Sequence, residues 1–161
     1  MENNEHRRFT IIEEIIKGLK LEYDCIYSHD GKRLLKSNED IESFTIKEGT
    51  EVICDWAFKG CDSLQSIVIP ESITEIGDGA FDGCKSLQSI VIPKSVTEIG
   101  WGAFYECESL QNIVIPDSVT KIDKEAFKGC ESLESIVIPN ETREYFEDLL
   151  DGEYHKLLKE E

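Results

Sequence analysis

The stretch LQSIVIPESITEIGDGAFDGCKS at residues 64–86 is repeated with few changes in the two stretches that follow it. Residues 87–109 read LQSIVIPKSVTEIGWGAFYECES, and residues 110–132 read LQNIVIPDSVTKIDKEAFKGCES. A more divergent copy, IESFTIKEGTEVICDWAFKGCDS, occupies residues 41–63, and a partial copy, LESIVIP, occupies residues 133–139. A fixed period of 23 residues indicates a stacked-repeat architecture.

Each copy begins with a short segment of alternating side chains that is typical of a β-strand. In S-I-V-I at residues 66–69, the two isoleucines face one side, while Ser66 and Val68 face the other. Pro70 then ends the strand because it has no N–H group to donate. The later part of the copy, G-A-F-x-G-C, is spaced like a single helical or 3-10 turn.

No single copy can bury its own apolar side chains, so the copies must stack on one another. Stacking at roughly 5 Å per copy turns equivalent positions into continuous ladders of like side chains. One ladder consists of Phe58, Phe81, Phe104 and Phe127, and another consists of Cys61, Cys84, Cys107 and Cys130. We therefore expect an α/β repeat solenoid with a parallel β-sheet along one face of a curved stack.

The pattern L-x-x-I-x-I-P-x-x-[VI]-x-x-I-x-x-x-A-F-x-x-C-x-x over residues 41–139 resembles the BspA-like, or treponemal-type, leucine-rich repeat family. The resemblance implies a segment of a leucine-rich-repeat horseshoe with the parallel β-sheet on its concave face. It also implies a role in binding, because many members of that family are bacterial surface or secreted proteins that bind host proteins or other cells.

The N-terminal region, residues 1–40, is predicted to cap the first copy, because a solenoid exposes apolar surface at its ends. Apolar side chains at helical spacing predict an amphipathic helix over residues 9–20. Residues 25–36 predict a β-hairpin that turns at Asp30-Gly31, since Asp-Gly between apolar pairs is a strong hairpin signal.

The C-terminal region, residues 140–161, is predicted to cap the last copy. Its aromatic and leucine side chains follow helical spacing, with a break expected near Asp151-Gly152. We therefore expect a helical cap that covers the final strand and shields its edge from solvent.

The composition excludes several classes of function. The chain has 161 residues, of which 40% are hydrophobic, and a formal net charge of −17. Nucleic acid is not expected as a partner, because binding phosphates needs a basic surface. Membrane insertion is not expected either, because no apolar run approaches the ~20 residues of a membrane span. The acidic surface favours a basic protein or peptide partner through long-range steering.

The N-terminal sequence MENNEHRRFTII lacks the cationic start, apolar run and cleavage site of a secretion signal. Six cysteines, most of them in register with the repeat, fit buried packing positions better than a secreted disulfide framework. Cys25 and Cys54 leave that register and are expected to be the more accessible thiols. The chain is predicted to be cytoplasmic as sequenced, with a cell-surface or secreted location as the alternative if the given sequence is truncated.

No motif predicts catalysis, a cofactor or a metal site. The glycines within residues 77–83 follow G-x-G-x-x-x-G, but they lie on the turn of the repeat rather than in a βαβ unit. Single cysteines 23 residues apart do not supply the paired ligands of a zinc site. His6, His29 and His155 have no neighbours at the spacing of a metal site or a catalytic triad. We predict that the chain is not an enzyme and holds no cofactor.

Two surfaces are candidates for binding a partner. The first is the outward side of the strands, where Ser or Asn and Val form rows: Ser66, Val68, Ser89, Val91, Asn112, Val114, Ser135 and Val137. The second is aromatic and lies on the turn, where Trp101 and Tyr105 replace aspartates of the preceding copy and Trp56 stands in a glycine position. Aromatic side chains of this kind often anchor interfaces. The alternatives are that the valines only support the sheet, and that the aromatic side chains pack against a terminal helix.

The sequence therefore predicts a non-catalytic protein-interaction module, a leucine-rich-repeat scaffold that binds its partner through the concave strand face. A bacterial cell-surface or secreted adhesin is one alternative. A structural protein that associates with itself through strand edges or solenoid ends is the other.

Overall fold

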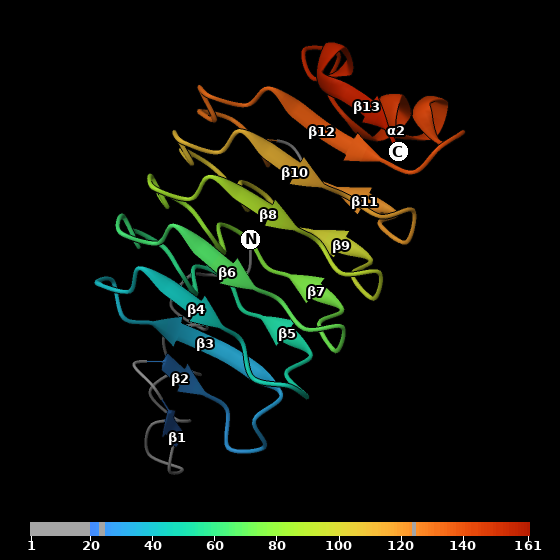
Figure 1. The fold of residues 1–161 in the computed structure, drawn as a ribbon. Helices are drawn as coiled ribbons and strands as arrows, with labels where there is room; N and C mark the ends of the chain where they lie inside the picture. Colours follow the sequence, from blue (N-terminus) through green and yellow to red (C-terminus); the bar gives the residue numbers. More distant parts are fainter. Residues whose placement is uncertain (1–19, 23–24, 124) are drawn as a thin grey trace, which may run out of the picture.

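The computed structural model describes residues 20–22, 25–123 and 125–161. Successive copies of the repeat lie one above another, so the chain forms a β-solenoid that runs from β4 to β13 (Figure 1). The helix predicted over residues 9–20 falls almost entirely outside the described residues. Lys20, its last residue, begins strand β1 (Lys20–Glu22).

The first strand of each copy lies on one face of the solenoid. These strands are β4 (Ser43–Thr45), β6 (Ser66–Val68), β8 (Ser89–Val91), β10 (Asn112–Val114) and β12 (Ser135–Ile138). β4 pairs with β6, and β10 pairs with both β8 and β12, in each case parallel and in register with the repeat: Val114 is the direct neighbour of Val91 on one side and of Val137 on the other. Among the described residues no pairing joins β6 to β8. The strands are parallel as predicted, but they form two separate sheets rather than one continuous sheet.

A second strand of two residues follows in each complete copy and was not predicted. These strands are β5 (Val52–Ile53), β7 (Glu75–Ile76), β9 (Glu98–Ile99) and β11 (Lys121–Ile122), and they pair in parallel with one another. Two residues are too few to show the alternation that marks a strand in a sequence. These strands exist because the neighbouring copies place equivalent residues side by side.

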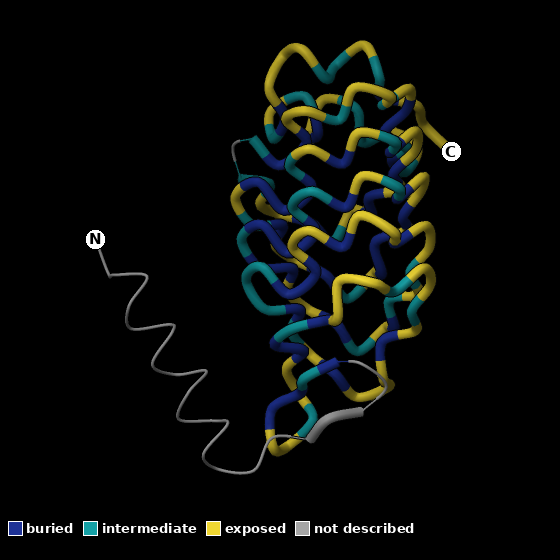
Figure 2. Tube along the Cα trace, turned by 90° about the vertical axis from the view of Figure 1, so that its left-hand side faces the viewer, coloured by how far each residue is buried: buried dark blue, intermediate teal, exposed yellow. Residues whose placement is uncertain are grey.

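The interior of the solenoid is filled by ladders of equivalent side chains, visible in Figure 2 as buried segments that recur in every turn. The phenylalanine rings are stacked nearly parallel, with centroid distances of 5.0 Å (Phe58–Phe81), 5.3 Å (Phe81–Phe104) and 5.7 Å (Phe104–Phe127). All four rings are buried. Burying a large aromatic side chain contributes about 2–3 kcal/mol, so this stack is a principal source of stability.

The turn after each short strand forms a separate ladder of backbone hydrogen bonds. Within a copy, N–H groups donate to the carbonyl three residues earlier, as in Cys84 to Phe81 at 3.1 Å, which fits the predicted 3-10-like turn. Between copies, the N–H groups of the first three stacked phenylalanines donate to the alanine carbonyl of the next copy. The three bonds are Phe58 to Ala80, Phe81 to Ala103 and Phe104 to Ala126, at 2.7, 2.8 and 2.8 Å.

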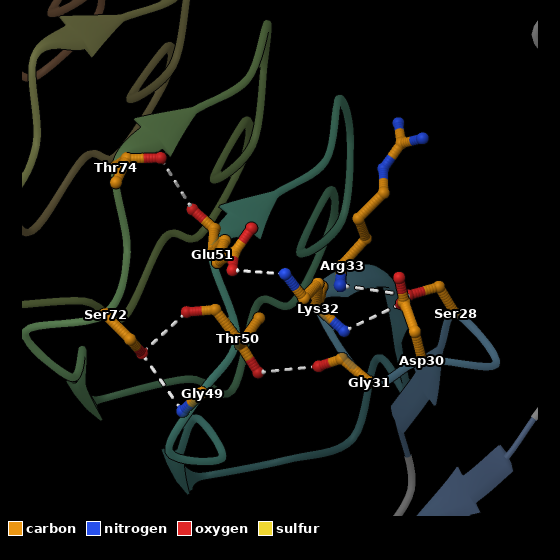
Figure 3. Close-up of polar contacts among 10 residues, drawn as sticks. All are labelled: Ser28, Asp30, Gly31, Lys32, Arg33, Gly49, Thr50, Glu51, Ser72 and Thr74. Carbon is orange, nitrogen blue, oxygen red and sulfur yellow. Dashed lines mark hydrogen bonds and ion pairs between the residues drawn. The ribbon is translucent and has the colours of Figure 1, made fainter.

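The predicted N-terminal hairpin is present and closes the first end of the solenoid. β2 (Cys25–Tyr27) and β3 (Arg33–Ser37) are antiparallel, and the chain turns between them at Gly31, whose φ is +74°. β3 then pairs in parallel with β5, so the hairpin adds its strands to the edge of the sheet of short strands. Figure 3 shows the polar contacts of this junction, including Lys32 Nζ bonded to Glu51 at 2.8 Å.

The predicted C-terminal helical cap is wrong over much of its length. Only α2 (Arg143–Leu149) is an α-helix, and after the break at Asp151-Gly152 come a 3-10 helix, η1 (His155–Leu157), and a strand, β13 (Leu158–Glu160). β13 pairs in parallel with β12 and extends its sheet by one strand. The strand forms because the edge of β12 offers backbone partners that the periodicity of the segment does not reveal.

Candidate interaction surface

The outward side of the strands carries an exposed row of valines. Val68, Val91 and Val114 are 59%, 64% and 36% exposed, although the isoleucines between the rows are buried or half-buried. Register places Val91 beside Val114. The neighbouring outward side chains, Ser66, Ser89 and Asn112, are also exposed, and we call these six residues the valine face.

The last row of the predicted surface does not share this exposure. Ser135 is buried, and its hydroxyl is hydrogen-bonded to the side-chain oxygen of Asn112. Val137 is half-buried, and its strand pairs with β13. β13 therefore forms the edge of this sheet beside β12, where the repeat pattern predicted a further row of exposed side chains. The valine face is limited to β6, β8 and β10.

The predicted aromatic surface forms a cluster on the turns of two copies, residues 41–63 and 87–109. Trp101, 40% exposed, lies between Trp56 and Tyr105, with ring centroids 6.3 and 6.5 Å away. The ring of Trp56 occupies the space that a Cβ at Gly79 would need, so a glycine in the next copy is what admits the tryptophan. The sequence pointed to all three aromatic residues but did not show that they touch.

A lysine completes this aromatic cluster and was missed by the sequence analysis. Lys59 Nζ lies 4.4 Å from the centroid of the Trp56 ring and 3.0 Å from the carboxylate of Asp82. A cation over an aromatic face is attracted by the ring quadrupole. Lys59 and Asp82 occupy the same position in adjacent copies, and this exchange of charge sign was the one signal that could have predicted the pair.

The cysteine ladder has a structural role. The thiols of Cys84, Cys107 and Cys130 are hydrogen-bonded to the carbonyls of Phe58, Phe81 and Phe104, at 3.2, 3.2 and 3.1 Å. Burial raises the pKa of the Cys107 thiol well above its usual value and raises that of Cys130 to about 12. These thiols are therefore protonated and poor nucleophiles at neutral pH.

The expectation that Cys25 is accessible is wrong, because it is fully buried between the strands of the N-terminal hairpin and the core. Cys54 is half-buried. Within the described ranges, no cysteine is part of a disulfide, and no three His, Cys, Asp or Glu side chains gather closely enough to hold a metal ion. His29 is exposed, and a ring nitrogen of His155 lies 3.0 Å from the carbonyl of Leu150.

Comparison with known proteins identifies the family of this repeat. The family model described as the BspA type leucine rich repeat region matches residues 31–151 in six copies. The chain belongs to this family. The BspA-type match begins within the hairpin and ends in the C-terminal region, so it includes more than the four complete copies and one partial copy seen in the sequence.

Solved structures of bacterial leucine-rich repeat proteins share this fold. A leucine rich cell surface protein from Faecalibacterium prausnitzii is 29% identical, with a TM-score of 0.63, over 80% of this chain and 41% of its own. A leucine-rich repeat protein from Eubacterium ventriosum is 28% identical, with a TM-score of 0.73, over 77% of this chain and 34% of its own. The chain thus spans less than half the length of these two relatives.

A leucine rich repeat protein from T. pallidum is also similar. It is 25% identical, with a TM-score of 0.57, over 74% of this chain and 67% of its own. No curated protein matches the chain. Among the described residues, no helix has the length and apolar character needed to cross a bilayer.

Proposed function

We propose that this BspA-type chain is a non-catalytic interaction module that binds a protein or peptide through the valine face. The observation that carries the proposal is the exposure of Val68, Val91 and Val114 in adjacent strands. Val91 and Val114 lie side by side on paired strands, and Val68 lies on the preceding strand, β6. Exposed apolar side chains grouped in this way among serine and asparagine often mark binding sites. Covering the exposed part of each valine contributes roughly 1 kcal/mol.

The partner surface that fits the valine face is apolar at its centre and basic around it. The net charge of −17 attracts cationic molecules over long range, which raises the rate of association more than the final affinity. We therefore expect binding to weaken as ionic strength rises, chiefly through slower association.

The aromatic cluster is proposed as a second contact region. Trp101 and Tyr105 lie on the turns rather than on the strands, so a partner that reached both regions would have to wrap around the solenoid. Because Lys59 and Asp82 already form an ion pair beside the cluster, we expect this region to contribute less than the valine face. Trp101→Ala should weaken binding less than a change in the valine row.

Affinity capture from an extract of the source cells, with the immobilised chain and with variants of it, tests the proposal. Val91→Glu and Val114→Glu each place a charge on the valine face, and His29→Glu adds the same charge on the exposed hairpin turn as a control. The two valine variants should lose the partners that the control retains, while circular dichroism shows that all three remain folded. An unchanged partner set for the valine variants contradicts the proposal.

A cell-surface, adhesin-like role is the second candidate, because one of the relatives is described as a cell surface protein. The cytoplasmic location predicted from the sequence competes with it. Brief protease treatment of intact cells distinguishes the two: digestion of the chain supports the surface role, and full protection supports the cytoplasmic location. A cytoplasmic protein digested in parallel only after lysis is the control.

A further inference from the structure

In two columns of the turns, the backbone hydrogen bonds between successive copies run in one direction. In the stacked-phenylalanine column, Phe58, Phe81 and Phe104 each donate an N–H group to the alanine carbonyl of the next copy. Two residues further along, Gly83 donates to the Tyr105 carbonyl and Glu106 to the Lys128 carbonyl, both at 2.8 Å. In these columns each copy thus offers donors toward the C-terminal end of the solenoid and acceptors toward the N-terminal end.

The last complete copy has no following turn to accept its donors. The equivalent N–H groups belong to Glu125, Phe127 and Gly129, and within the described residues none of the three has a hydrogen-bond acceptor. We call these three groups the ladder end. Aligned peptide units leave a partial positive charge at the end where their N–H groups are unpaired, as at the N-terminus of a helix. The ladder end is therefore prepared to receive carbonyl oxygens.

A cleft of about 420 Å³ lies beside the ladder end. One wall is the turn from Phe127 to Leu133, and the other is the segment from Glu153 to Leu157. Clefts of this size can hold a few side chains of a peptide. Its apolar lining comes from the Phe127 turn and the C-terminal segment: Phe127, Leu133, Tyr154 and Leu157.

Charge around the cleft favours a neutral or basic occupant over an anion. Lys128 and Lys156 line the cleft together with Glu131 and Glu153, so their formal charges cancel. Lys128 is in addition paired with Glu125, at 2.9 Å. With a net charge of −17 on the whole chain, a free anion would be repelled at long range.

A second copy of this chain does not fit the ladder end. The first turn of a second copy would have to present its carbonyls, but the hairpin already uses them. Ala57 O accepts the Ser37 N–H at 2.8 Å, and Lys59 O accepts Lys36 Nζ at 3.3 Å. Two ladder ends facing each other would oppose donors to donors.

We propose that the ladder end and its cleft bind a segment of a partner protein that adopts the same turn as the repeat. In this complex the segment's carbonyls accept the N–H groups of Phe127 and Gly129, and an apolar side chain enters the cleft beside Tyr154 and Leu157. The hydrogen bonds between copies, at 2.7–2.9 Å, specify the geometry that such a segment would complete. The site is separate from the valine face.

The free state is tested first, by amide hydrogen exchange measured by NMR on the full chain. Gly129 and Gly83 occupy the same position in their copies, yet only Gly83 has an acceptor, the carbonyl of Tyr105. The Gly129 amide should exchange at least 100-fold faster than that of Gly83. Equal protection of the two amides overturns the proposal, because the donor would then be occupied.

Binding is tested with a capped peptide that copies residues 121–130, with Cys130→Ser. This segment contains the Ala126 and Lys128 carbonyls that accept from the preceding copy, and its net charge is positive. Titration should shift the amide signals of residues 127–130 and 154–157 and slow exchange at Gly129. A scrambled peptide of the same composition should do neither, and sodium acetate tests a simple anion site.

Two variants locate the peptide. Lys156→Trp fills the cleft and should weaken peptide binding at least tenfold, whereas Lys159→Trp, on exposed β13 outside the cleft, should leave it unchanged. The proposal is overturned if the peptide shifts no signals, if both variants bind equally well, or if acetate alone reproduces the shifts.

Discussion

The two ends of this solenoid are closed in different ways. At the N-terminal end, β3 pairs with β5, and the Ser37 N–H donates to the carbonyl of Ala57 in the first turn. At the C-terminal end, β13 extends the sheet of long strands beyond β12, while the last turn is met by the ring of Tyr154. The N-terminal cap therefore provides backbone hydrogen-bond partners for the short strands and the first turn. The C-terminal cap provides such partners for the long strands.

The difference follows from the direction of the turn ladder. Because every N–H in its columns points toward the C-terminus, the N-terminal cap must donate hydrogen bonds and the C-terminal cap must accept them. A hairpin strand has N–H groups to donate. The C-terminal cap places the edge of an aromatic ring on Phe127, at a centroid distance of 5.8 Å, and leaves the nearby donors beside a cleft.

Alkaline pH should lower the unfolding free energy more than any substitution described below. It acts on two thiols together, Cys107 in the interior and Cys130 at the C-terminal end. Burial raises both pKa values above the usual 9.0, that of Cys130 to about 12. The stabilisation is complete below pH 9 and is lost as pH rises toward 12, since only the unfolded thiols ionise there. Each thiol should lower the unfolding free energy by about 1.4 kcal/mol per pH unit.

Urea unfolding at a series of pH values between 8 and about 11.5 checks this slope. In Cys107→Ser, a hydroxyl that does not titrate takes the place of the thiol, so the slope should be shallower by about 1.4 kcal/mol per pH unit. An unchanged slope means that Cys107 ionises equally in both states.

Leucine truncations at the two caps come next in size. Leu34 is fully buried on β3, between β2 and β5, and Leu34→Ala should cost about 3–4 kcal/mol in unfolding free energy. Leu158 is buried on β13 but has a strand on one side only, so Leu158→Ala should cost about 2–3 kcal/mol. Urea unfolding measures both. A larger loss for Leu158→Ala contradicts the view that the N-terminal cap is the more completely packed.

Removal of the ring that covers the last turn should have a smaller effect. Tyr154 is half-buried and meets Phe127 edge-on, so Tyr154→Ala should cost about 1–2 kcal/mol. Tyr154→Phe keeps the ring and should stay within about 0.5 kcal/mol of the parent. Thermal or urea unfolding distinguishes the two variants, and equal losses would show that the hydroxyl rather than the ring provides the stability.

The smallest effect is expected at the polar contacts of each cap. Arg143 Nη2 donates to the carbonyl of Leu158 at 2.7 Å and joins α2 to β13, so Arg143→Ala should cost about 1 kcal/mol. Lys32→Ala at the other end removes an ion pair in which both side chains are about half exposed, and it should cost less. A loss that is greater for Lys32→Ala reverses this order.

Much of the fold could be predicted from the sequence because identical residues recur at one spacing. The register of the long strands, the stacking of Phe58, Phe81 and Phe104, and the hairpin turn at Gly31 each follow from local pattern. The short strands and β13 could not be predicted, because each depends on a neighbouring backbone rather than on its own periodicity. Helical spacing in residues 140–161 even favoured the wrong element for β13.

The candidate surface, too, could be predicted from the sequence only in part. The sequence identified the valines and the aromatic residues as departures from a buried pattern, and Val91 and Trp101 are indeed exposed. It could not show that Ser135 is buried, that Trp56 lies over Gly79, or that Cys25 belongs to the core. Each of these depends on residues that do not follow the repeat. Some lie outside the repeated copies, and Trp56 replaces the residue that the repeat has at its position.

The sequence by itself determined that this chain is a BspA-type solenoid, because a 23-residue period leaves apolar positions that only stacking can bury. The tertiary structure alone decided how the stack ends. At an end the period supplies no next copy, so the partners of β12 and of the Phe127 turn come from non-repeating segments. Their pairing depends on which backbone groups remain unsatisfied, and that is a property of the assembled fold.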